Sequence, residues 1–163
     1  MITKTNPNPS GELSGKNFEL ITWSEKYYTG VPLIDSQHRE LIKLTNELYN
    51  ACMGGKEKMD SVFKDAMRRM VDYVRFHFNA EQELLKQINY PEYPQHKTQH
   101  DSLVKDILEA AAEYKDGAKF VPNYFVRRLK DWIFSHIAVY DQQWARYVHG
   151  EKAKGNLVNL GNQ

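Results

Sequence analysis

Apolar side chains recur along residues 63–88 in the alternating four- and three-residue steps of a long helix that buries one face. The positions are Phe63, Met67, Met70, Val74, His77, Glu81, Leu84 and Ile88. A period near 3.5 residues is typical of helices that pack together in a bundle. Two members of this stripe, His77 and Glu81, are polar. Because an unpartnered imidazole or carboxylate is costly to bury, we expect a ligand to hold both, and a metal ion is the leading candidate.

Three further segments carry the same pattern. The first helix is predicted from Asp35 or Ser36 to Gly54-Gly55, the second opens near Asp60 and stops at Asn89, the third runs from Pro94 to Asp116-Gly117, and the fourth starts at Pro122. The inner positions of the other three helices are Ile34, His38, Leu41, Thr45, Leu48 and Cys52; His96, His100, Leu103, Ile107, Ala110 and Tyr114; and Phe125, Leu129, Trp132, His136, Asp141, Ala145 and Val148. Four such helices with short connections predict an all-α, antiparallel up-down-up-down four-helix bundle.

The two ends of the chain differ from this pattern. Residues 1–18 are rich in Asn, Pro, Ser, Gly and Lys and predict a flexible N-terminal arm. Residues 18–33 are apolar and aromatic without a helical period, which indicates an extended segment packed on the bundle. The bundle itself is expected over 19–150, and a flexible C-terminal tail over 151–163.

Composition restricts the class of protein. The chain has 163 residues, about the size of one domain, with a formal charge of +1. Because its positive and negative charges nearly cancel, the chain is not expected to bind nucleic acid. No apolar run is long enough for a membrane span, and the N-terminus lacks the apolar core of a signal peptide. With a single cysteine, the expected location is cytoplasmic.

Five of the six histidines fall on predicted inner stripes, together with one Glu and one Asp. The set is His38, His77, Glu81, His96, His100, His136 and Asp141, and His149 stands outside it. A single histidine on an apolar face is more often a hydrogen-bonded core residue, but that explanation does not cover five. Two pairs also have the i, i+4 spacing that directs two ligands at one centre. Imidazole with carboxylate suits Fe, Zn, Mn or Cu.

Seven side chains are too many for one ion. Two six-coordinate ions that share two bridging carboxylates and an oxide or hydroxide would keep one coordination position open. An open position beside a bridging hydroxide is what reversible binding of a small diatomic molecule requires.

The motifs IDSQH, HFNAEQELL followed by YP, HKTQH and WIFSHIAVYD resemble the hemerythrin family in its bacterial single-domain form, over about residues 19–148. The resemblance implies a non-haem di-iron centre of two iron ions (Fe2+/Fe3+) with a bridging oxo or hydroxo group. By the same resemblance His96, His100 and His136 bind one iron and His38 and His77 the other, Glu81 and Asp141 bridge them, and dioxygen binds at the iron with two histidines.

A dry pocket is expected over the open position, because external protons would leave an oxidised, inactive site. The hydrophobic residues expected there are Leu41, Phe78, Trp132, Ile133 and Ile137. The chain departs from the common family pattern at three positions. Gln82 replaces a frequent Glu, Asn89 a frequent Gly, and Trp144 a frequent Tyr, which puts in doubt the hydrogen bond that the tyrosine hydroxyl would supply.

The resulting hypothesis is a non-enzymatic oxygen carrier, store or local supplier, expected to be a monomer with transient contacts to an oxygen-consuming or signalling partner. One alternative is an oxygen or redox sensor. Another is a di-iron enzyme with peroxidase or nitric oxide chemistry. Oxidising di-iron bundles tend to be rich in carboxylates with Glu-x-x-His pairs, whereas this set has five histidines, two carboxylates and no such pair.

The spacing of His136 and Asp141 predicts an irregular backbone. At about 100° per residue the two side chains would lie about 140° apart around a regular α-helix. One extra residue in the turn restores the phase, because the stripe then resumes as Asp141, Ala145 and Val148. We therefore expect a single π-helical turn between His136 and Asp141.

Overall fold

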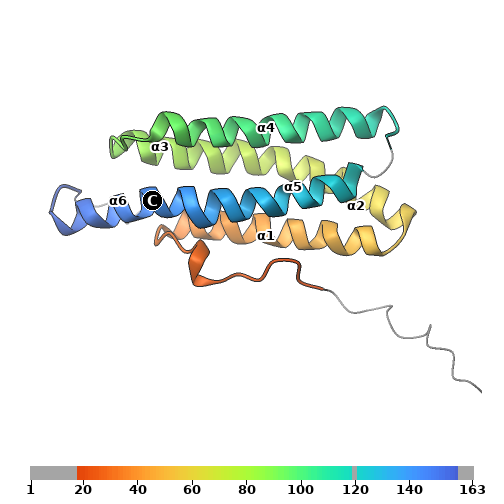
Figure 1. The fold of residues 1–163 in the computed structure, drawn as a ribbon, viewed down its shortest axis with the longest axis horizontal. Helices are drawn as coiled ribbons and strands as arrows, with labels where there is room; N and C mark the ends of the chain where they lie inside the picture. Colours follow the sequence, from red (N-terminus) through yellow and green to blue (C-terminus); the bar gives the residue numbers. More distant parts are fainter. Residues whose placement is uncertain (1–17, 119–120, 158–163) are drawn as a thin grey trace, which may run out of the picture.

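The computed structural model describes residues 18–118 and 121–157, and in these residues the chain forms helices and turns without a strand. Figure 1 shows four antiparallel rods. The first rod is α1 (Pro32–Met53) and the third is α4 (Tyr93–Lys115). The second consists of α2 (Lys56–Tyr73), the π-helical turn η2 (Val74–Phe78) and α3 (Asn79–Gln87); the fourth consists of α5 (Val121–Ser135), the π-helical turn η3 (His136–Tyr140) and α6 (Asp141–Ala153). The predicted all-α four-helix bundle is confirmed.

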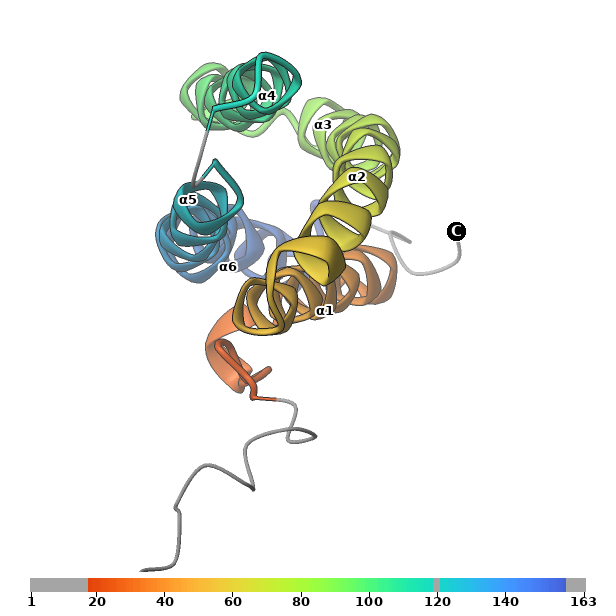
Figure 2. The same ribbon diagram turned by 90° about the vertical axis from the view of Figure 1, so that its right-hand side faces the viewer.

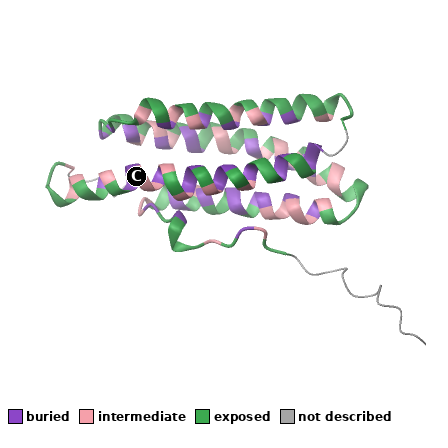
Figure 3. Ribbon diagram, viewed as in Figure 1, coloured by how far each residue is buried: buried purple, intermediate pink, exposed green. Residues whose placement is uncertain are grey.

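Viewed along their axes, the rods stand around a common centre (Figure 2), with α1 next to both α2 and α5, and α4 next to α5. Buried residues line the sides that face this centre, and exposed residues cover the outer sides (Figure 3). Within the described parts of the chain, no helix is both long and apolar enough to cross a membrane. The buried hydrophobic residues of the inner sides form two clusters, a larger one that includes Leu48, Phe63 and Leu129 and a smaller one that includes Ile34, Leu85 and Trp144.

The start of α1 differs from the prediction. The helix begins at Pro32, whose fixed φ angle and missing N–H suit the first helical position. Asp35 lies in the first turn, and its buried carboxylate accepts hydrogen bonds from the backbone N–H groups of Thr29 at 2.8 Å and Gly30 at 3.2 Å. The predicted start at Asp35 or Ser36 is wrong, because Asp35 secures the preceding turn from inside the helix. Likewise α2 begins at Lys56, before the predicted Asp60.

The helix ends follow the expected residue types more closely. Asn89 adopts a φ of 52°, and the N–H of Tyr90 donates to the Leu85 carbonyl at 2.9 Å. This left-handed end confirms the predicted stop at Asn89. By contrast, α6 continues to Ala153, so residues 151–153 of the expected flexible tail are helical. Residues 158–163 of that tail, and residues 1–17 of the flexible arm expected over 1–18, lie outside the described residues.

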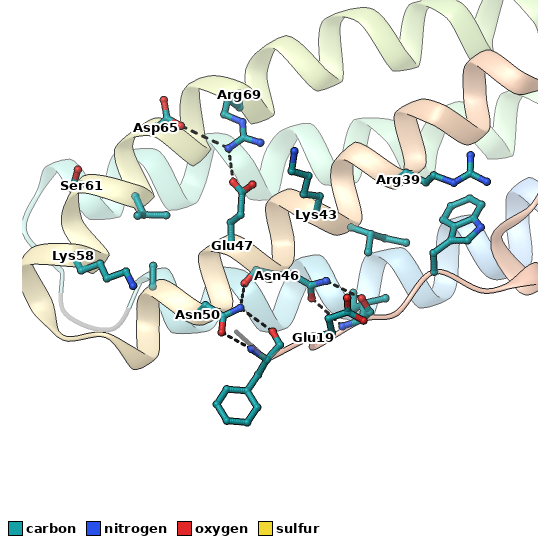
Figure 4. A pocket seen from close by; sticks show the side chains of 16 residues that line it. Glu19, Arg39, Lys43, Asn46, Glu47, Asn50, Lys58, Ser61, Asp65 and Arg69 are labelled. Carbon is teal, nitrogen blue, oxygen red and sulfur yellow. Dashed lines mark hydrogen bonds and ion pairs between the residues drawn. The ribbon is translucent and has the colours of Figure 1, made fainter. Parts of the chain in front are cut away.

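The segment before α1 runs alongside the bundle, as predicted, and includes the short helical turn η1 (Glu25–Tyr27). Two side chains of α1 secure it (Figure 4). Asn50 accepts from the Phe18 N–H at 2.8 Å and donates to the Phe18 carbonyl at 2.7 Å. Asn46 makes the same pair of bonds with Ile21, at 3.0 and 2.8 Å. Because the amides satisfy both backbone groups, this segment packs on α1 without forming regular structure.

Candidate metal centre

The seven candidate ligands meet in the middle of the bundle, and none is more than 3% exposed. His38 lies on α1, His96 and His100 on α4, His77 in η2, Glu81 on α3, His136 at the start of η3 and Asp141 at the start of α6. Their ligand atoms form two groups, each with atoms within 4.8 Å of one another: Glu81 with His96, His100 and His136, and Glu81 with His38 and His77. These groups contain six of the seven predicted residues, and Asp141 contacts them through His136 and His38.

The two carboxylates lie between the groups. Asp141 Oδ1 is 3.1 Å from His136 Nε2, whereas Asp141 Oδ2 is 3.2 Å from His38 Nε2. Glu81 Oε2 is 2.9 Å from His100 Nε2 and 3.6 Å from His77 Nε2. Each carboxylate therefore reaches histidines of both groups, as carboxylates that bridge two ions must do.

Several buried polar atoms of the candidate ligands lack hydrogen-bond partners, as expected for atoms that bind a metal ion. Buried polar groups in proteins nearly always have partners, yet atoms of six candidate ligands have no hydrogen-bond partner within the described structure. These atoms are both ring nitrogens of His38, His77 Nε2, His96 Nε2, His136 Nδ1, Glu81 Oε2 and Asp141 Oδ2. They are nitrogen and carboxylate donors of the kind that suits iron and related ions. Coordination would satisfy them and offset the cost of burying two negative charges.

Burial and neighbouring charges shift the pKa values of the candidate ligands. Burial lowers the pKa of His77 and His100, because a low-dielectric core disfavours imidazolium. Burial acts to lower the pKa of His96, but the negative charge of Glu81, whose Oε2 lies 3.3 Å from Nε2, outweighs this effect and the pKa is raised. For Glu81 and Asp141 burial raises the pKa, yet neighbouring imidazoles outweigh it and hold both pKa values below the usual range. The directions at Glu81, Asp141, His77 and His100 suit metal binding, which needs carboxylates and neutral imidazoles, whereas the raised pKa of His96 does not.

The backbone irregularity predicted between His136 and Asp141 is confirmed, since η3 is a π-helical turn over His136–Tyr140. Its extra residue directs Asp141 inward, where the side chain is fully buried. A second π-helical turn, η2, carries His77 and was not predicted. His77, Glu81 and Ile88 are buried as predicted, while Leu85 is fully buried in place of the predicted Leu84. Both π-helical turns thus present histidines of the cluster.

Two glutamine side chains contact the outer nitrogens of the histidines. Gln37 Oε1 lies 2.9 Å from His77 Nδ1 and accepts a hydrogen bond from its N–H, which leaves Nε2 free to bind a metal. Gln82 lies 3.2 Å from His100 Nδ1 and accepts a bond from the Tyr93 hydroxyl at 3.3 Å. With its amide oxygen and nitrogen exchanged, Gln82 accepts from the His100 Nδ1–H and donates to the Tyr93 hydroxyl instead. Sequence reasoning did not identify Gln37 or Tyr93, because exposed and buried glutamines or tyrosines look alike in a sequence.

Trp144, which replaces a tyrosine frequent in the family pattern, donates a hydrogen bond to one of the candidate bridging carboxylates. Its indole N–H donates to Glu81 Oε1 at 2.7 Å, and the side chain is fully buried on α6. The same N–H lies 3.4 Å from Asp141 Oδ1. An indole N–H is a donor only, so this bond stabilises the ionised form of Glu81. The replacement of tyrosine at this position therefore keeps a donor at the carboxylate.

The five hydrophobic residues expected around the open position are all buried, and they belong to one cluster with the core of the bundle. Phe78 stacks on His100 with ring centroids 3.7 Å apart, and Trp132 stacks on His136 at 4.2 Å. These two rings therefore fix imidazole planes in the group with three histidines. Phe78 also lies 5.6 Å from the His77 ring. The five residues are Leu41, Phe78, Trp132, Ile133 and Ile137.

His149 lies outside the cluster, as the sorting of the six histidines predicts. Its Nε2–H donates to the Thr29 carbonyl at 2.9 Å. Gly30 packs so closely that a Cβ atom there would stand 2.8 Å from this imidazole. His149 therefore fastens the turn before α1 and takes no part in the metal centre.

Comparison with known proteins agrees with this geometry. Residues 29–148 match the family model of the hemerythrin HHE cation binding domain. The chain is 32% identical over 132 residues to a bacteriohemerythrin of Aquifex aeolicus, covering 78% of this chain and 96% of that one. It is 29% identical over 129 residues to the bacteriohemerythrin of Stenotrophomonas maltophilia, covering 79% and 82%. A solved structure of wild-type hemerythrin superposes with a TM-score of 0.67 at 26% identity, covering 78% and 96%.

Proposed function

This chain belongs to the hemerythrin family, and from that premise we propose that it binds dioxygen reversibly and serves as an oxygen carrier, store or local supplier. Members of the family bind oxygen at a non-haem di-iron centre. The observation that carries the proposal is the pair of buried groups that share Glu81. When bound, the two irons supply electrons and an open coordination position to dioxygen.

The residues that would hold the irons follow from the geometry. His96, His100 and His136 would hold one iron, and His38 and His77 the other. Glu81 and Asp141 would bridge the pair, because their oxygens reach histidines on both sides. The group with two histidines has fewer protein ligands, so the open position is expected there.

The surroundings of the centre favour reversible binding over further chemistry. Leu41, Ile133 and Ile137 are fully buried and bring no polar atom. These apolar side chains limit the access of bulk water to that part of the centre. The Trp144 N–H keeps Glu81 ionised and oriented. The imidazole planes stay fixed by the stacked rings of Phe78 and Trp132, which limits reorganisation when a ligand enters or leaves.

The wider setting of the protein is part of this proposal. A cytoplasmic location is supported by the single cysteine, which suits a reducing compartment. A monomer is supported by the cluster, since all of its members come from one chain. Transient contact with an oxygen-consuming or signalling partner would let such a protein deliver oxygen or report it.

Stopped-flow mixing of the reduced, iron-loaded protein with oxygen, followed by argon purging, tests the proposal. A carrier gives full reversal of the oxygen-induced absorption over repeated cycles. Oxidation that argon does not reverse would instead favour a redox sensor or an enzyme. The Asp141→Ala variant is the control, because the loss of a bridging ligand should abolish the oxygen-induced spectrum.

A further inference from the structure

Tyr73, the last residue of α2, carries a hydroxyl group that is enclosed in the bundle and has no hydrogen-bond partner among the described residues. Its ring stacks on the candidate ligand His77, with centroids 4.8 Å apart and planes inclined by 23°. The ring of Tyr73 therefore lies against the group with two histidines.

Tyr73 also lines a small surface pocket of about 180 Å³ between α1 and α2. Gln37 and Leu41 line the same pocket, and Gln37 is the partner of His77 Nδ1. A water molecule occupies roughly 30 Å³ of liquid, so the pocket can hold a diatomic or triatomic molecule. Tyr73 thus stands between this pocket and the group with two histidines.

One other tyrosine in the described structure has an enclosed hydroxyl without a partner. Tyr27 is fully buried, but it packs against Trp23 at 5.8 Å and Phe134 at 6.4 Å between ring centroids. Its ring makes no stacking contact with a candidate ligand in these residues. Both hydroxyls are therefore enclosed, but only the ring of Tyr73 stacks on a candidate ligand within the described structure.

We propose that Tyr73 is a ligand-binding residue, whose hydroxyl donates a hydrogen bond to the small molecule held beside His38 and His77. The pocket between α1 and α2 is the route by which that molecule arrives. The inference rests on the proposed function. Suitable ligands are dioxygen and small linear anions such as azide, which have lone pairs to accept the bond. The unpartnered donor is then retained for the ligand-bound state, in which its partner is present.

The test compares Tyr73→Phe with the matched control Tyr27→Phe, since both keep the ring and remove one enclosed hydroxyl. In the iron-loaded protein, Tyr73→Phe should raise the oxygen dissociation rate and the azide dissociation constant by about tenfold, the ratio equivalent to about 1.4 kcal/mol. Tyr27→Phe should leave both unchanged. Equal constants in Tyr73→Phe and wild type would overturn the inference. Azide binding does not require reversible oxygenation, so this arm decides even if the wild type fails to release oxygen.

The metal-free protein supplies a second readout. Because the Tyr73 hydroxyl has no partner there, Tyr73→Phe should leave the denaturation midpoint unchanged or raise it. A lower midpoint combined with unchanged azide binding would assign the hydroxyl a structural role and overturn the inference. A higher midpoint combined with weaker azide binding supports it, because a merely structural hydroxyl could not produce both.

Discussion

Removal of the Trp144 donor should weaken iron binding without removing any ligand. The perturbation is Trp144→Phe, which deletes the indole N–H that lies 2.7 Å from Glu81 Oε1. Trp144→Tyr is the matched comparison, because it removes the same indole and restores a hydroxyl donor. Both variants leave a similar gap in the core, so the difference between them isolates the hydrogen bond.

The magnitude follows from the charge and burial of the pair. A hydrogen bond to a charged group contributes about 1.5–3 kcal/mol. Glu81 is ionised and fully buried, and the donor is fully buried too. At about 1.4 kcal/mol per tenfold change, loss of this bond should weaken iron affinity roughly 10- to 100-fold, the range that is typical of lost partners behind metal ligands.

The assay is competition for iron between the protein and a chelator of known affinity, at fixed pH and salt. We expect Trp144→Phe to lose iron at a lower chelator concentration than Trp144→Tyr, with wild type the tightest. Circular dichroism of the metal-free variants checks that both keep their helices. If Trp144→Phe held iron as tightly as wild type, the bond would have no part in orienting Glu81.

Further substitutions, and removal of the metal, should each change one measured property in a stated direction. Asp141→Ala should lower iron content at both positions, His38→Ala should first weaken the iron expected to carry oxygen, and His149→Ala should leave the oxygen-induced absorption intact; loss of that absorption in His149→Ala would refute the sorting of the histidines. Backbone amides of residues 136–141 should exchange hydrogen faster in the metal-free protein than in the iron-loaded one, because coordination holds the π-helical turn, and equal rates would show that the turn needs no metal. Burial and the 2.7 Å bond to Asp60 raise the pKa of Tyr114 to about 12, so this tyrosine should ionise late in an ultraviolet titration. The unfolded chain releases that proton near pH 10, so the free energy of unfolding should fall between pH 10 and 12, and less steeply in Tyr114→Phe.

The two π-helical turns show what the sequence can reveal about this fold. The five-residue step from His136 to Asp141 breaks the helical period, so η3 could be predicted from spacing. The four-residue step from His77 to Glu81 is that of a regular helix, although His77 lies inside the π-helical turn η2 over Val74–Phe78. An irregularity placed before a ligand pair leaves the spacing of the pair intact and so escapes a pattern search.

Residue types alone also misplace a helix start and miss the partners of the ligands. Asp35 looks like a helix cap, but its carboxylate reaches back to backbone groups while Pro32 opens the helix. Gln37 precedes His38 in the sequence, yet it serves His77 from a different rod. Such contacts depend on how two helices face each other, which the period of one helix does not specify. The candidate ligands were predictable because polar residues on apolar stripes stand out.

The most direct test of the account is a crystal structure of the iron-loaded protein, with anomalous diffraction measured at the iron edge. The account predicts two iron peaks in each chain, one among His96, His100 and His136 and the other beside His38 and His77, with Glu81 and Asp141 between them. A single peak in each chain, or iron held only where two chains meet, would contradict it.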